Sequence, residues 1–215
     1  MLEYEQLRQE AKIGQIDPSV RVEGWIRRLR TEAPLDRVIA TVTRRLEQTD
    51  GDDHRSLSYE LVFLLREAER NQEALQLLDQ ILQCYPDDVL PGINKANVFF
   101  NSLDEPEEAL KCIEVALERA YRTKYFRRQA LGNKARILLK LGRGDELSDV
   151  LEEIMSLQMV TNIPDVARER DFVDRAPSGL IRKNVLDRYN EFRPRRPGDS
   201  LADEPPKYKP SDDNM

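Results

Sequence analysis

The chain has little of what catalytic and metal sites require. Among 215 residues there is one histidine, His54, and there are two cysteines, Cys84 and Cys112. Protein metal sites need about four such ligands at close spacing, so we expect no metal and no cofactor. His54 follows the acidic turn 50–53 and is expected to be a solvated loop residue. The cysteines lie in apolar helical stretches and are expected to be buried, reduced thiols.

Membrane, secretion and phosphate-loop signals are missing as well. No apolar run approaches the roughly 18 residues that a membrane span needs, and the start, 1–6, lacks a basic-then-apolar signal. The glycines of 142–144 follow no predicted strand and indicate a helix break. Acid pairs at 107–108 and 152–153 are expected on solvated helix faces. We therefore predict a cytoplasmic, non-enzymatic protein with no membrane segment.

Charge is unevenly distributed along the chain. The formal net charge is −6, which argues against a general nucleic-acid binder because phosphate neutralisation requires a basic surface. Residues 51–120 hold 6 basic and 15 acidic side chains, whereas 121–145 hold 8 basic and 1 acidic. The second stretch contains a basic–aromatic patch: Arg122, Lys124, Tyr125, Arg127 and Arg128. Internal pairing with acidic helices, an acidic protein partner, or nucleic acid would each account for this patch.

Apolar residues recur at helical spacing, without sustained period-2 alternation, so the sequence predicts an all-α fold. Two helices are expected at 18–29 and 34–48, before an acidic turn at 50–53. Three helix–turn–helix segments follow: 57–68 with 72–85, 91–100 with 106–120, and 127–141 with 145–157. Further helices are expected at 1–12, 164–175 and 178–192, and the proline-rich charged tail is expected to be disordered.

The breaks between these helices carry recognisable signals. Asn71 and Gly142 are expected to take the left-handed conformation that ends a helix. Asp104, followed by Pro106 and Glu107, has the pattern of an N-cap with proline in the first turn and a capping acid.

Small residues recur at positions where neighbouring helices would have to approach closely. They are Ala96 and Ala135 in first helices, and Ala74 and Ala109 in second helices. Later packing positions hold Ile81, Ala116 and Ile154, and Leu147 takes the small position of the third second helix. The run 133–136 (Asn-Lys-Ala-Arg) also echoes 94–97 (Asn-Lys-Ala-Asn).

This pattern resembles the tetratricopeptide repeat (TPR), whose helix pairs recur about every 34 residues, over roughly residues 55–160. The resemblance implies a right-handed solenoid of antiparallel helix pairs. On it we predict N-terminal capping helices in 1–50, the TPR-like array in 51–160, C-terminal capping helices in 161–192, and the disordered tail in 193–215.

The resemblance also implies a binding groove, since in this family the first helices line a concave face that holds a peptide or helix. Carried over, the groove residues are Tyr59, Phe63, Arg66, Asn94, Asn97, Asn101, Asn133, Arg136 and Lys140. An amide can both donate to and accept from a partner's backbone, although asparagines also occur on helix surfaces by chance. We predict a protein–protein interaction module of the adaptor, scaffold or chaperone-like kind, with a partner segment that is acidic in one interpretation. The acidic 51–120 block leaves a second hypothesis, an immunity- or antitoxin-type inhibitor of a toxin or enzyme. No pattern indicates the oligomeric state.

Overall fold

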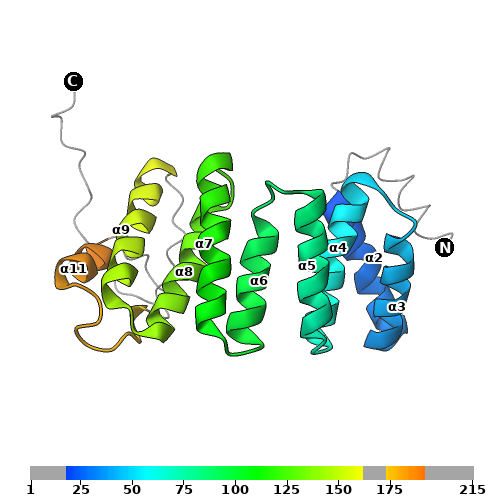
Figure 1. Cartoon of the computed structure of the whole chain (residues 1–215), viewed down its shortest axis with the longest axis horizontal. Helices are drawn as coiled ribbons and strands as arrows, with labels where there is room; N and C mark the ends of the chain where they lie inside the picture. The colour runs from blue at the N-terminus through cyan, green and yellow to red at the C-terminus, as the bar shows by residue number, and fades with distance from the viewer. Residues whose placement is uncertain (1–17, 162–172, 192–215) are drawn as a thin grey trace, which may run out of the picture. The chain divides into compact units, whose positions relative to one another are not determined.

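The structure is a computed structural model that describes residues 18–161 and 173–191 (Figure 1). Every regular element in these ranges is an α-helix, which confirms the predicted all-α fold. The helices are α2 (Pro18–Glu32), α3 (Leu35–Leu46), α4 (Gly51–Glu67), α5 (Asn71–Cys84), α6 (Leu90–Asn101), α7 (Pro106–Thr123), α8 (Arg127–Leu141), α9 (Gly144–Thr161) and α11 (Lys183–Glu191). The predictions for 1–12, most of 164–175 and the tail lie outside the described residues.

The chain forms two compact units that divide after Glu105. The N-terminal unit contains α2 to α6, and the C-terminal unit contains α7, α8, α9 and α11. The two helices of the second predicted pair, α6 and α7, therefore belong to different units, and each is described with its own unit.

In the N-terminal unit, α4 is the central helix. It packs against α2, α3 and α5, and α5 packs in turn against α6. Leu57, Leu61 and Leu64 recur at the spacing of one helical face and are buried, so α4 contributes an apolar stripe to a single core. Trp25 of α2 is only 7% exposed and belongs to the same core.

In the C-terminal unit, α8 packs between α7 and α9, and α11 packs against α9. The small residues Ala109, Ala116 and Ala135 are fully buried. The predicted small and packing positions in both units are likewise buried: Ala74, Ile81, Ala96, Leu147 and Ile154. Side chains of this size let two helix backbones approach closely, which is the physical reason for the repeat pattern.

The segment 173–191 is attached to the first turn of α9. The Ser148 hydroxyl accepts the Arg182 backbone N–H at 3.0 Å and donates to the Gly144 carbonyl at 2.8 Å. A Cβ at Gly144 would overlap the Leu180 carbonyl oxygen, so only glycine allows this contact. The helix predicted at 178–192 begins later, at Lys183, because the turn before it includes Gly179 with φ 81°.

Four predictions about turns and helix ends are wrong. The acidic turn is shorter than predicted because Asp50 is extended and Gly51, at φ 60°, already starts α4. His54 therefore lies half-buried in the first helical turn rather than in a solvated loop. Asp53, also in that turn, is buried in an ion pair with Arg21 of α2, which fixes the start of α4.

The other two concern helix ends. Glu69, at φ 58°, makes the left-handed turn after α4, because its place two residues past the helix lets Arg70 N–H reach the Leu65 carbonyl. Asn71 instead begins α5. Asp104 also has φ 58° and so lacks the extended backbone of an N-cap. Gly142 is left-handed at φ 69°, as predicted.

The cysteines are not buried. Cys84, the last residue of α5, is exposed, and Cys112 is partly exposed; among the described residues neither forms a disulfide. The apolar pattern around them did not distinguish the core-facing side of each helix from its rim. Among the described helices, none has both the length and the apolar character needed to cross a membrane.

Candidate interaction faces

The predicted groove residues fall in both units. Tyr59, Phe63 and Arg66 lie on α4 and Asn94, Asn97 and Asn101 on α6, all in the N-terminal unit; Asn133, Arg136 and Lys140 lie on α8 in the C-terminal unit. The two sets are therefore described separately.

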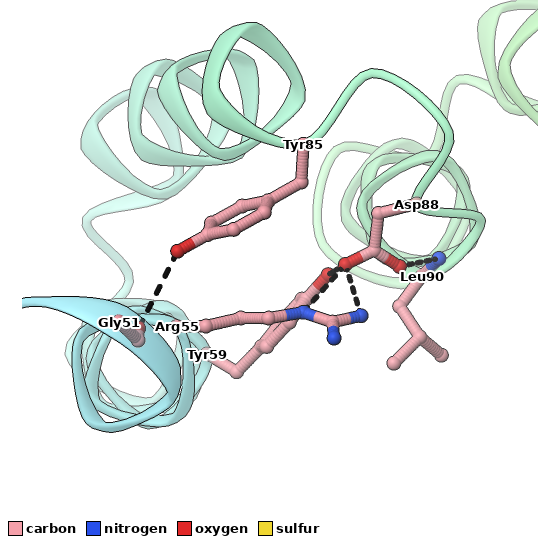
Figure 2. A network of polar contacts seen from close by, with 6 residues as sticks. All are labelled: Gly51, Arg55, Tyr59, Tyr85, Asp88 and Leu90. Atoms are coloured by element: carbon pink, nitrogen blue, oxygen red, sulfur yellow. Dashed lines mark hydrogen bonds and ion pairs between the residues drawn. The ribbon is translucent and has the colours of Figure 1, made fainter.

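A polar network around Asp88 connects α4 to the start of α6 (Figure 2). The Asp88 carboxylate accepts hydrogen bonds from Arg55 Nε at 3.0 Å and Nη2 at 2.6 Å, and from the Tyr59 hydroxyl at 2.7 Å. Its other oxygen accepts the Leu90 N–H at 3.1 Å, which caps the first turn of α6. The Tyr85 ring lies 5.6 Å from the Arg55 guanidinium. The network thus fixes the α4 face relative to α6.

Burial and the neighbouring charges determine the protonation of this network. Burial and then the hydrogen bond to Asp88 raise the pKa of Tyr59 far above its usual value. Burial alone would lower the pKa of Arg55, but its bond and charge interaction with Asp88 raise it overall. Tyr59 therefore remains a hydroxyl donor and Arg55 a cation, and both are committed to an internal contact.

No sequence pattern indicated the whole of this network. Asp88 precedes a helix that has Pro91 near its start, which is an N-cap signal. That signal could have identified Asp88 as a cap, but no spacing in the sequence indicates that Arg55 and Tyr59, from an earlier helix, reach the same carboxylate.

Two of the predicted α4 residues, Phe63 and Arg66, take no part in the Asp88 network. Tyr59, Phe63 and Arg66 share one stripe of the helix, because positions four and seven apart lie on one face. Phe63 is 49% exposed. Burial lowers the pKa of Arg66, and its Nε is buried without a hydrogen bond. Within the part of the chain that the structure describes, no carboxylate pairs with Arg66.

The three asparagines of α6 differ in solvent exposure. Asn94 is 9% exposed, Asn97 is half-buried and Asn101 is exposed. Asn101 Nδ2 donates to the Asn97 carbonyl at 3.1 Å, whereas the side-chain amides of Asn94 and Asn97 make no hydrogen bond to another described residue. Half-buried amides without internal partners can bond to a neighbouring chain.

The groove residues predicted on α8 combine a contact within their own helix with solvent exposure. Asn133 Nδ2 donates to the Gln129 carbonyl at 3.0 Å within its own helix. Arg136 and Lys140 are exposed, one turn apart.

The basic–aromatic patch is partly occupied by internal pairing. Arg127 donates to Glu153 Oε1 from Nη2 at 2.6 Å and from Nε at 2.9 Å, and its guanidinium lies 4.6 Å from the Tyr121 ring centroid. The Tyr121 hydroxyl donates to the same carboxylate at 2.8 Å. Glu153 is therefore part of an internal cluster, although its side chain remains 27% exposed.

Other cations of the basic stretch are also paired: Lys134 with Glu114 at 3.0 Å and Arg143 with Glu146 at 2.5 Å. In contrast, Tyr125 is 71% exposed and Lys124 is exposed. Among the described residues, no group of three or more histidine, cysteine, aspartate or glutamate side chains is placed to hold a metal ion.

Comparison with known proteins supports the fold. No family model matches the sequence, and no curated protein matches it. The solved structures that match include two described as nearly identical TPR-like repeats of a "putative kinesin light chain" from Podosopora anserina. One is 19% identical, with 74% of each chain covered and a TM-score of 0.45. The other, a point variant with the same description, is 16% identical, with 88% of this chain and 92% of that chain covered and a TM-score of 0.50. The buried repeat positions and this second likeness together show that the chain has a TPR-like repeat fold.

Proposed function

We propose that this protein is a non-enzymatic protein–protein interaction module, of the adaptor, scaffold or chaperone-like kind. In the N-terminal unit a partner segment lies against α4 and α6, and α8 of the C-terminal unit presents a separate binding face. The observation that carries the proposal is Arg66, a half-buried guanidinium to which the described residues offer no carboxylate. It lies on the same stripe as the exposed Phe63 ring.

These two side chains favour binding for different reasons. Covering the Phe63 ring removes apolar surface from water, and full burial of such a side chain contributes about 1.5–3 kcal/mol. Arg66 has already lost part of its hydration, so a partner carboxylate would gain a charge-assisted bond at a reduced desolvation cost.

The Asn97 amide supplies a polar contact for the same partner segment. It is half-buried and makes no side-chain hydrogen bond within the described chain, so it can donate to and accept from a partner backbone. Tyr59 has a supporting role in this arrangement, because its hydroxyl is already bound to Asp88.

The test is affinity capture from native cells with the full chain as bait, followed by mass spectrometry. The double variant Phe63→Ala, Arg66→Glu should no longer capture the partner proteins. The double variant Arg136→Glu, Lys140→Glu, in the C-terminal unit, should capture less of them. Arg37→Glu is the matched control, since Arg37 is an exposed cation on α3 in the same unit as Arg66. Circular dichroism should show unchanged helicity in all variants. An unchanged set of partners in both double variants would exclude the groove.

The inhibitor hypothesis is less well supported, because much of the acidic block is internally paired. Ion pairs join Arg21 to Asp53, Arg30 to Glu67, Arg55 to Asp88, Arg70 to Glu73 and Lys95 to Asp79. Rescue of cells from a toxin encoded next to this protein's gene would favour it over the adaptor.

A further inference from the structure

The turn between α7 and α8 exposes aromatic side chains. We call residues 121–128 the α7–α8 corner, and 124–126 its tip. The exposed fractions are 46% for Tyr121, 71% for Tyr125 and 43% for Phe126. Single exposed apolar residues are normal on a protein surface, but three aromatic rings within six positions concentrate apolar surface at one corner of the C-terminal unit.

The backbone of the tip is strained. Lys124 and Phe126 both have left-handed backbones, at φ 64° and 59°. This region costs free energy for any residue with a Cβ, and a bulky aromatic residue there is an outlier. At the other end of α8, Gly142 makes a left-handed turn without that cost. The tip therefore retains side chains where stability alone favours glycine, and such strain is concentrated at functional positions.

The base of the corner is rigid. The Tyr121 hydroxyl and the Arg127 guanidinium both bind Glu153 of α9. The Lys124 N–H bonds to the Ala120 carbonyl at 2.8 Å, and the Phe126 carbonyl accepts the Ala130 N–H at 2.9 Å. The exposed rings are thus presented in a fixed geometry, which lowers the entropy lost when a partner binds.

The charge of the corner selects the kind of partner. Lys124 is exposed, and no described carboxylate pairs with it. Arg122 is also exposed, and the first turn of α8 contains Arg127 and Arg128 but no acidic residue. A helix N-terminus is itself electropositive. Although Glu153 compensates Arg127, Lys124 places at the tip a positive charge that no described carboxylate pairs, beside the electropositive start of α8, and this favours an acidic ligand.

We propose that the α7–α8 corner is a second interaction surface, which binds an acidic segment of a partner protein and covers Tyr125 and Phe126 with an apolar side chain of that segment. Its residues differ from those proposed to bind a partner on α4 and α6 in the N-terminal unit and on α8 in the C-terminal unit, so the two proposals can fail independently. A protein partner is favoured over nucleic acid because the chain as a whole has a net charge of −6.

The experiment uses a library of random peptides as the probe, selected on the full chain. The selected peptides should combine several acidic residues with an aromatic or aliphatic one. Their affinity should fall at least about tenfold in Tyr125→Ala with Phe126→Ala and in Lys124→Glu, since a few aromatic and charged anchors dominate such interfaces. It should also fall as salt is added.

A further variant separates binding from folding. Phe126→Gly removes the ring and also relieves the strained backbone, so it should weaken peptide binding while the free energy of unfolding is unchanged or increases. A ring that only supported the fold would give the opposite result, a loss of stability. Val115→Ala, at an exposed apolar position of α7 in the same unit, is the matched control and should leave the affinity of the selected peptides unchanged. Phe63→Ala tests separately whether the peptides bind the proposed groove.

Four results would overturn the corner proposal. They are a library that yields no binder, selected peptides without acidic residues, equal binding to the Tyr125→Ala, Phe126→Ala double variant, and binding lost in Phe63→Ala instead. The last would assign the peptides to the groove and so support the proposed function. Labelled poly(U) RNA serves as a second probe, and RNA binding that disappears in the double variant would assign the corner to nucleic acid.

Discussion

Removal of the Asp88 carboxylate is the perturbation whose effect follows most directly from the structure. The carboxylate is 3% exposed, and it receives Arg55, Tyr59 and the Leu90 N–H together. Asp88→Ala leaves the half-buried Tyr59 hydroxyl without its acceptor and the first turn of α6 without its cap. The side chain of Arg55 is 39% exposed and can recover part of its hydration.

The free energy of unfolding that Asp88→Ala removes is the sum of three contributions. Loss of the cap costs about 1 kcal/mol, and the stranded Tyr59 hydroxyl costs about 1 kcal/mol more. The Arg55 bonds are charge-assisted, but partial exposure screens them, so we count about 1 kcal/mol for the pair. Asp88→Ala should therefore lower the free energy of unfolding of the N-terminal unit by roughly 2–4 kcal/mol.

Urea unfolding measured by tryptophan fluorescence is the assay. Trp25 is the only tryptophan, and it is buried in the core of the N-terminal unit, so its emission reports on that unit. Tyr59→Phe should cost only about 1 kcal/mol, and Asp88→Asn should fall between the two because it retains an acceptor oxygen. Gln76→Ala, at an exposed position of α5 in the same unit, is the control and should change stability by less than about 0.5 kcal/mol. The reasoning is refuted if Asp88→Ala is no more destabilising than Tyr59→Phe.

Three further predictions concern single positions. Gly144→Ala should destabilise the attachment of 173–191 by about 1–3 kcal/mol, because the added Cβ clashes with the Leu180 carbonyl; unchanged hydrogen-exchange protection of that segment would contradict this. Burial and a nearby carboxylate raise the pKa of Glu60, so the folded state binds its proton more tightly than the unfolded state and stability is lost as pH rises through that pKa. Glu60→Gln should then be more stable than the parent protein at pH 7 by a few tenths of a kcal/mol after solvent screening and equal to it in acid; a gap that persists in acid would refute the assignment. Gly24→Ala, in the interior of α2 with nothing near its Cβ, should stabilise by about 0.5–1 kcal/mol, and Gly142→Ala, at φ 69°, should destabilise by about 1–2 kcal/mol. Thermal unfolding that shifts both variants in the same direction would contradict the backbone argument.

Much of the helical layout followed from local patterns. The helices from α2 to α9 lie where apolar periodicity and turn residues placed them, with ends shifted by a few residues. The buried alanines Ala96, Ala109 and Ala135 were identified because small residues at repeat spacing have a single physical role, close helix packing. The errors at Asn71, Asp104 and His54 arose at helix ends, where several neighbouring residues can make the same turn.

The candidate faces were predictable only in part. The predicted groove residues lie on α4, α6 and α8, but the sequence could not show that the Tyr59 hydroxyl binds Asp88 or that no described carboxylate pairs with Arg66. Both facts depend on what other helices bring near these side chains. The basic stretch, residues 121–145, was also predictable only in part. Its composition indicated a patch, whereas the structure divides it into paired cations and an exposed, strained tip.

The sequence by itself determined that this protein is an all-α, TPR-like chain, because helical periodicity and the recurrence of small residues are local properties. Only the tertiary structure decided which polar groups are satisfied internally and which remain available to a partner. Hydrogen bonds and ion pairs such as Arg55–Asp88 and Arg127–Glu153 join positions far apart in the chain. The pairing of a surface charge depends on this three-dimensional neighbourhood, and so does the exposure of Phe63, Tyr125 and Phe126.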